Sequence, residues 1–153
     1  MVLIKENLEK KRKVYFCGDR YRKVWENKAD WIYTHVKILE RVVPGYVLGY
    51  NNDYIEYAVI EGTVADSIEH TDEFIKQVYT FCLENIAATK PWVHGDWVLS
   101  NIIVQPHGRM AMIDWDNLGM YREADYMKKL HRDLHSAFGD KFFEIIKHDP
   151  TSI

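Results

Sequence analysis

The chain has few cysteines and no long apolar run, and these absences exclude several protein classes. Among its 153 residues it has two cysteines, Cys17 and Cys82, whose spacing indicates neither a disulfide framework nor a zinc site, although a single bridge between them stays open. No apolar stretch approaches the length that crosses a membrane. The start, MVLIKENLEKKRK, has too short an apolar stretch for a signal peptide. Its charged residues also follow the apolar stretch instead of preceding it. We therefore expect a soluble protein of a reducing, cytoplasmic compartment, with no membrane partner.

An excess of basic charge is also lacking. The 20 Lys and Arg residues face 23 Asp and Glu residues, which gives a formal net charge of -3. Nucleic-acid-binding domains carry a basic excess, so the composition argues against nucleic acid as the main partner. Hydrophobic residues make up 47% of the chain and aromatic residues 14%, which is enough for one folded domain with a core.

The first part of the chain has the pattern of β structure around one helix. KVYFCGD and RYRKVW predict a hairpin over residues 13–25, with its turn at Gly18 and Asp19. Apolar residues recur at helical spacing over 26–43, and Pro44 and Gly45 end that helix. Two further strands are predicted at 46–50 and 54–60, joined by the turn residues Asn-Asn-Asp.

The second part is mainly helical around one hairpin. The spacing predicts a helix over 71–88, with Phe74, Val78, Phe81 and Cys82 on one face. Residues 101–105 and 110–114 predict two strands around a Pro-His-Gly-Arg turn. A helical pattern then runs over 124–148, where Gly139 indicates a break into two helices. We predict an α+β fold in one domain, 1–153, with a β-rich lobe over 1–60 and a helical lobe over 61–153.

Carboxylate and amide side chains gather around this hairpin. In VHGDWVLSN, Asp96 precedes Asn101, which begins the first strand, and Asp114 ends the second strand. A tight hairpin brings its two ends together, so the side chains of Asn101 and Asp114 can converge on one ion. Phosphoryl transfer needs oxygen ligands for magnesium and a carboxylate that orients or deprotonates the attacking hydroxyl. The pattern therefore predicts a magnesium and phosphoryl-transfer centre.

The same residues resemble the motif of the aminoglycoside phosphotransferase and choline kinase superfamily, which has the protein-kinase-like fold. That motif is His-x-Asp, four residues, Asn, and a hydrophobic strand ending in Asp, as in HGDWVLSN and IDWD here. The resemblance implies a two-lobed kinase-like fold of reduced size that uses Mg2+ and ATP or another nucleoside triphosphate. It implies that Asp96 is the catalytic base or orients the acceptor hydroxyl. It also implies that Asn101 and Asp114 are the magnesium ligands.

Three further residues of this part receive supporting roles from the resemblance. His94 resembles a structural residue that holds the loop, as a buried loop histidine would without any catalytic role. Asp116 either assists the metal or stays outside its ligand shell. Asp125 resembles the helix-start carboxylate that braces the catalytic loop, but a plain charge at a helix N-terminus would look the same.

The first lobe matches the family less closely. Lys23 resembles the strand lysine that binds the α- and β-phosphates, although an exposed strand lysine would look the same. Its acidic partner is open between Glu40 and Glu26, while His35 lies nearer to the position where the acid is expected. The stretch IEYAVIEG resembles the hinge whose backbone meets adenine, here Glu56, Tyr57 and Ala58.

The acceptor side of the predicted site is short. About forty residues follow Asp114, so the acceptor site is open, a second copy completes it as a homodimer, or transfer has been lost. Four aromatic residues surround the acidic loop, and they either hold an amine through cation–π contacts or pack the core. They are Trp92, Trp97, Trp115 and Tyr121.

Three functions follow from these observations. The leading prediction is an ATP- and magnesium-dependent phosphotransferase acting on a hydroxyl of a small molecule, with an amine-bearing acceptor as one option. The second is a nucleotide-binding pseudokinase with little turnover. The third is a metal-dependent hydrolase, whose residues would be His94, Asp96, Asp114 and His107.

Overall fold

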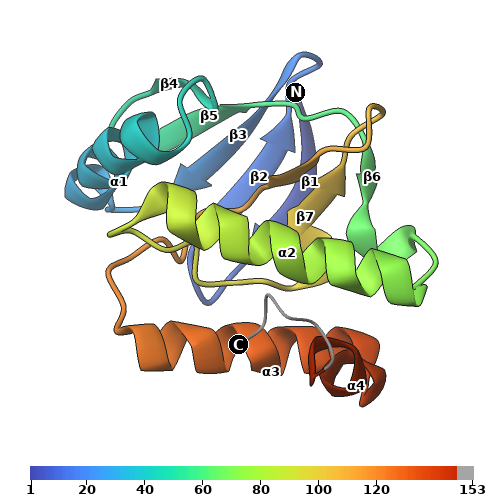
Figure 1. Ribbon diagram of the computed structural model, residues 1–153. Helices are drawn as coiled ribbons and strands as arrows, with labels where there is room; N and C mark the ends of the chain where they lie inside the picture. Colours follow the sequence, from blue (N-terminus) through green and yellow to red (C-terminus); the bar gives the residue numbers. More distant parts are fainter. Residues whose placement is uncertain (148–153) are drawn as a thin grey trace. The chain divides into compact units, whose positions relative to one another are not determined.

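A computed structural model describes residues 1–147 and divides the chain into two compact units (Figure 1). The first unit is Met1–Val59, and the second begins at Ile60, next to the lobe boundary that the sequence predicts. His148, the predicted last residue of the final helix, lies outside the described residues. Within the described part of the chain, no helix has the length and apolar character needed to cross a membrane.

The first unit is an antiparallel five-stranded sheet with one helix. The strand order is β1-β2-β3-β5-β4, and the two predicted hairpins, β2–β3 and β4–β5, are confirmed. Strand β1 was not predicted: it forms the edge of the sheet and is exposed on both faces, so its sequence lacks the alternation of a half-buried strand. The elements are β1 (Val2–Asn7), β2 (Arg12–Phe16), β3 (Arg20–Trp25), α1 (Ala29–Val42), β4 (Val47–Tyr50) and β5 (Tyr54–Ala58).

Helix α1 packs on β4 and β5 through the face that its sequence spacing predicts. Ile32, Val36 and Leu39 are fully buried there, and His35 stacks on Trp31 with 4.4 Å between ring centroids. The β4–β5 turn is closed by the side chain predicted for it, because Oδ1 of Asn51 accepts the backbone N–H groups of Asp53 and Tyr54.

As far as residue 147, the second unit combines the α-helices α2, α3 and α4 with a three-stranded sheet, in the strand order β6-β7-β8 (Figure 1). Helix α4 packs against both α2 and α3, and Tyr79 of α2 contacts the rings of His131 and Phe142. Gly139 ends α3 with a φ of 75°, which confirms the predicted break. The elements are β6 (Thr63–Val64), η1 (Ala65–Ser67), α2 (Asp72–Thr89), η2 (Leu99–Asn101), β7 (Ile102–Val104), β8 (Met110–Met112), α3 (Glu123–Phe138) and α4 (Lys141–Lys147).

Helix α2 begins at a side-chain cap and differs from its predicted buried face at one residue. The Thr71 hydroxyl oxygen accepts the backbone N–H of Phe74 at 3.1 Å, as an N-cap residue does. Phe74, Val78 and Cys82 are buried as predicted. Phe81 is only partly buried, because a helix turns by about 100° per residue and so directs it away from the stripe that contains Cys82.

The two cysteines are free thiols with different surroundings, so we expect them to react differently. Cys82 is fully buried, and desolvation raises the pKa of its thiol well above the ordinary value, whereas Cys17 is partly exposed. A thiol reagent should therefore label one cysteine in the native protein and two after unfolding in guanidinium. The Cys17→Ser variant should show no labelling until it is unfolded. Two equivalents of native labelling would contradict the buried position of Cys82.

The contact between α2 and α3 predicts a pH-dependent stability. The Tyr79 hydroxyl lies 3.0 Å from Nε2 of His131, and burial lowers the pKa of that histidine. The folded state therefore favours neutral His131, so its contribution is complete above the unfolded pKa of about 6.5 and is lost as the pH falls through the folded value. Urea unfolding between pH 7.5 and 5 should show His131→Gln losing less stability on acidification than wild type. Substitution of the exposed His107 is the control, and an unchanged pH dependence in His131→Gln would contradict the prediction.

Candidate active site

The site is built on the hairpin of β7 and β8. Ile102 pairs with Met112 in the antiparallel ladder, and the N–H of Ile113 donates to the carbonyl oxygen of Asn101 at 2.8 Å. This bond places Asn101 beside the residue that precedes Asp114. The backbone at the two ends of the hairpin therefore converges, as the sequence predicts for Asn101 and Asp114.

His94 connects the loop before the hairpin to the end of β8. It is fully buried, its Nε2 lies 2.8 Å from the Ile113 carbonyl oxygen, and its Nδ1 lies 3.2 Å from the backbone nitrogen of Asp96. A carbonyl can only accept and a backbone N–H can only donate, so Nε2 carries the proton and Nδ1 accepts. Both ring nitrogens are thus occupied by backbone groups, one of Asp96 and one of Ile113. Such contacts suit the loop-holding role that the resemblance implies for His94.

The side chains of Asp96 and Asn101 are joined directly. Nδ2 of Asn101 lies 3.1 Å from the backbone oxygen of Asp96 and 3.1 Å from its carboxylate Oδ2, and it donates to both. Because the nitrogen makes these two bonds, the amide oxygen of Asn101 is the end that can bind a cation. The Asp96 side chain is 26% exposed, so the carboxylate is accessible to a substrate.

Two backbone positions near the carboxylates have positive φ. Gly95 has a φ of 85°, and a Cβ atom there would lie 2.8 Å from the Asn117 carbonyl oxygen, so only glycine fits. Asp114 has a φ of 56°, a left-handed conformation that aspartate tolerates better than most residues and that is frequent at functional sites. Val93 and Gly119 form two backbone hydrogen bonds, of 2.8 and 3.1 Å, which hold the segment after Asp114 against the loop.

Helix α3 contributes two residues that the sequence did not predict. Oδ2 of Asp133, whose side chain is 9% exposed, accepts the backbone N–H of Trp97 at 3.1 Å. Lys129 donates to the same oxygen, and its Nζ lies 3.7 Å from Oδ1 of Asp96. One feature of the sequence could have indicated these two residues. Lys129 and Asp133 are four positions apart, which places both on the helix face that buries Tyr126.

Asp133, and not Asp125, holds the loop. The side chain of Asp125 is 57% exposed in the first turn of α3 and bonds Arg122 at 2.9 Å. The alternative that the sequence left open, a charge at a helix N-terminus, describes this position. Asp133 lies two turns further along, where the helix is buried against the loop.

The aromatic residues near the loop divide into core and surface. Trp97 and Trp115 are 0% and 2% exposed, and Trp115 donates from Nε1 to the Met112 carbonyl oxygen at 3.2 Å. These two pack the core, as one of the two interpretations held. Tyr121 is 46% exposed and is therefore the ring best placed to meet a ligand.

A hollow of about 250 Å³ lies between the loop and the start of α3; Asp96, Asn101 and Asp114 are not among its lining residues, but the chain neighbours of Asp96 are. Gly95 and Trp97, the two neighbours of Asp96 in the chain, form part of its wall. The other lining residues are Asn117, Tyr121, Asp125, Tyr126 and Lys129. The hollow combines aromatic surface with charged groups, which suits a small polar molecule.

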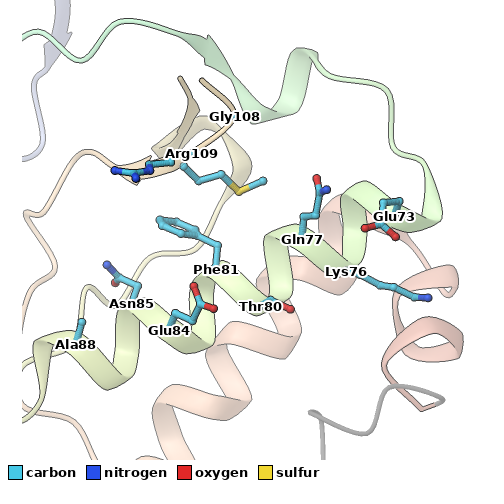
Figure 2. A pocket seen from close by; sticks show the side chains of 11 residues that line it. Glu73, Lys76, Gln77, Thr80, Phe81, Glu84, Asn85, Ala88, Gly108 and Arg109 are labelled. Atoms are coloured by element: carbon cyan, nitrogen blue, oxygen red, sulfur yellow. The ribbon is translucent and has the colours of Figure 1, made fainter. Parts of the chain in front are cut away.

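A larger open hollow of about 740 Å³ lies elsewhere in this unit, between α2 and the β7–β8 turn (Figure 2). Phe81 points from α2 toward the turn that carries Arg109. None of Asp96, Asn101 and Asp114 lines this hollow. Its size alone therefore does not mark it as the active site.

The metal-binding capacity of the site depends on an amide as well as a carboxylate. Within residues 1–147 there is no group of three or more His, Cys, Asp or Glu side chains that could hold a metal ion. Magnesium, however, keeps several waters and commonly binds through one or two carboxylates together with substrate phosphates. Asn101 and Asp114 fit that requirement. The hydrolase alternative is not supported, because both nitrogens of His94 are occupied and His107 is exposed in the hairpin turn.

The candidate phosphate-binding lysine lies in the first unit. Lys23 is on β3, and its Nζ lies 5.5 Å from the centroid of the Tyr57 ring. Glu40, one of its two predicted acidic partners, lies 3.9 Å from Lys37 and is 51% exposed. The other, Glu26, is exposed just after β3 ends.

The segment predicted to meet adenine lies in β5, between β3 and β4 in the sheet. Glu56 and Tyr57 are paired with both β3 and β4, and the Ala58 N–H donates to the Tyr46 carbonyl oxygen at 2.8 Å. Backbone outside the strand ladder therefore begins at Val59. The strand pattern in the sequence does not show where this pairing ends.

The carboxylate of Glu56 forms ion pairs across the sheet. It lies 2.9 Å from Arg22, its partner in the β3–β5 register, and 3.3 Å from Arg20. The hydrogen bond from Arg22, with a further contribution from Arg20, holds the pKa of Glu56 below its ordinary value. This side chain therefore stabilises the pairing of β3 and β5.

Comparison with solved structures shows the same fold. A crystal structure of WbdD has a TM-score of 0.61 and 15% identity, covering 86% of this chain and 36% of that one. A structure of the bifunctional kinase-methyltransferase WbdD has a TM-score of 0.62 and 14% identity, covering 84% of this chain and 35% of that one. A structure of monomeric WbdD has a TM-score of 0.54 and 12% identity, with coverage of 90% and 40%. The chain thus spans little more than a third of these proteins, and its fold is a reduced, two-lobed, protein-kinase-like fold.

Comparison of the sequence with protein families identifies the family directly. No curated protein matches the chain. The sequence profile of the Phosphotransferase enzyme family, APH, matches residues 48–149, about two thirds of the chain, and this range contains Asp96, Asn101 and Asp114. Family and fold agree with the resemblance carried by HGDWVLSN and IDWD. The chain belongs to the phosphotransferase enzyme family.

Proposed function

We propose that the protein transfers the γ-phosphate of ATP, with Mg2+, to a hydroxyl group of a small molecule. The observation that carries this proposal is the connected set of Asp96, Asn101 and the end of β8. His94 fixes the backbone of Asp96, and the Asn101 amide holds the Asp96 carboxylate, whose chain neighbours line a hollow. The backbone bond from Ile113 holds Asn101 next to the residue before Asp114. Phosphoryl transfer depends mainly on such positioning and on charge neutralisation.

Each residue has a defined task in this proposal. Asp96 orients the acceptor hydroxyl and takes its proton as the hydroxyl oxygen bonds to the γ-phosphorus. The bond from that phosphorus to the β–γ bridging oxygen breaks, and ADP leaves with the electron pair. Asn101 and Asp114 would hold Mg2+, which neutralises phosphate charge when bound. Lys23, through its ammonium group, binds the phosphates.

The hollow between the loop and α3 indicates the size of the acceptor. A volume of about 250 Å³ is enough for a small molecule. Tyr121 and Asp125 on its wall offer an aromatic face and a carboxylate, which favour an acceptor bearing an amine. The predicted homodimer stays a separate prediction.

Nucleotide binding and turnover test the proposal in two steps. Mg-ATP should raise the melting temperature, because a ligand that binds only the folded state stabilises it. A panel of small hydroxyl compounds, with amine-bearing and amine-free members, should then give acceptor-dependent ADP release. No thermal shift with ATP, GTP or ADP would refute nucleotide binding altogether. A thermal shift without turnover on any acceptor would instead favour the pseudokinase alternative.

A further inference from the structure

We propose that Lys129 is a positioning residue that fixes the carboxylate of Asp96 for phosphoryl transfer. This inference rests on the proposed function, and it concerns a residue outside the motif that identifies the family. Lys129 comes from the middle of α3, 33 positions after Asp96 in the sequence. Its Nζ lies 3.7 Å from Oδ1 of Asp96 and also bonds Oδ2 of Asp133.

The two oxygens of Asp96 have different partners, a hydrogen-bond donor and an ion-pair partner. Oδ2 accepts from the amide nitrogen of Asn101 at 3.1 Å, while Oδ1 faces the ammonium of Lys129. Rotation of the carboxylate about its Cβ–Cγ bond would move both oxygens away from these partners. The free lone pairs of the Asp96 carboxylate therefore keep a fixed direction. A residue that orients an acceptor hydroxyl needs such a fixed direction.

The position of Lys129 is itself fixed by Asp133, one turn further along α3. Asp133 is nearly buried and accepts both the Lys129 ammonium and the backbone N–H of Trp97, the residue after Asp96. Lys129 and Asp96 are 31% and 26% exposed, so this is a partly buried network and not an isolated surface pair. Isolated surface pairs contribute little, whereas connected charges with shared hydrogen bonds hold a defined geometry.

Lys129 also lines the hollow that the proposal gives to the acceptor. Without its ammonium, the carboxylates of Asp96 and Asp133 would lose the cation that lies between them. Asp96 would then turn toward solvent or toward Asn101 alone. Substrate binding on the nucleotide side would be unaffected, and the rate of transfer would fall.

Steady-state kinetics separate this role from a structural one. Lys129→Met should lower kcat by about 10- to 100-fold, the size of effect expected when a reacting group is misplaced, with the KM for ATP unchanged. Lys129→Arg keeps the charge and should restore kcat to within a few-fold of wild type. Lys128→Met is the matched control, because Lys128 is the exposed neighbour on α3, and it should match wild type. Melting temperatures of all variants show whether each is folded.

A double-mutant cycle shows whether Lys129 acts through Asp96. If it does, Lys129→Met should reduce the residual rate of the Asp96→Asn variant much less than it reduces wild type. Full additivity of the two effects, or a kcat of folded Lys129→Met equal to that of Lys128→Met, would overturn the inference and leave the proposed function intact. Should Lys129→Met be poorly folded, the kcat of Lys129→Arg decides, and a loss as large as that of Asp96→Asn counts against a charge-based role. Absence of turnover in wild type would refute the proposed function, and this role with it.

Discussion

Asp96→Asn is expected to reduce the rate of phosphoryl transfer by about 10²- to 10⁴-fold, the range typical for loss of a general base. Asparagine keeps the size of the side chain and one oxygen that can accept the Asn101 bond now made to Oδ2. It cannot take the proton of an acceptor hydroxyl. The fold and the binding of Mg-ATP should therefore be retained while transfer is lost.

Three measurements check this prediction. Acceptor-dependent ADP release gives the rate, the thermal shift with Mg-ATP gives nucleotide binding, and urea unfolding gives stability. Asp140→Asn is the control, since Asp140 is a 99% exposed carboxylate between α3 and α4. Equal turnover in Asp96→Asn and wild type would remove Asp96 from the catalytic role. Loss of the nucleotide-induced shift would show that Asp96 acts in binding instead.

The sequence predicts those parts of the site that depend on neighbours in the chain. Asn101 and Asp114 flank a hairpin of fixed length, so local turn chemistry alone brings the backbone at its two ends together. The helix over α2 and the break at Gly139 follow in the same way from periodicity and from a residue that tolerates a positive φ.

Contacts between distant elements could not be predicted from local patterns. The bond from Trp97 to Asp133 joins residues 36 positions apart, and it depends on which turn of α3 lies against the loop. Periodicity identifies the buried face of α3 but not the segment that covers it, so Asp133 was not predicted, and Asp125 at the helix start was one of two open interpretations. The same limit explains why Lys129 was not predicted.

The edges of strands were the other feature that the sequence did not determine. Strand β1 lies at the sheet edge and is exposed on both faces, so hydrophobic alternation does not mark it. At β5, pairing continues through Ala58, beyond the point that the sequence pattern shows. Pairing depends on neighbouring strands, whose register is a property of the folded sheet.

Gly95→Ala should have the second large effect, on both stability and activity. Gly95 has a φ of 85°, and a Cβ there would lie 2.8 Å from the Asn117 carbonyl oxygen and 3.1 Å from the Tyr121 ring. The left-handed backbone costs a non-glycine residue about 1–2 kcal/mol. Displacement of the rigid backbone at Asn117 adds an overpacking cost of about 1–3 kcal/mol. Because Gly95 precedes Asp96, the same displacement should move the carboxylate and lower kcat by about tenfold or more.

Gly108→Ala separates the two causes. Gly108 has a φ of 90°, nearly that of Gly95, but a Cβ there would meet nothing within 4 Å. This variant should therefore lose only the backbone contribution of about 1–2 kcal/mol and keep full activity. Urea unfolding of both variants gives the difference, which measures the contact with Asn117. If Gly95→Ala loses no more stability than Gly108→Ala and keeps its kcat, then the segment after Asp114 yields to the added methyl group. In that case the position of Asp96 depends on His94 and Asp133, which hold the loop from its other side.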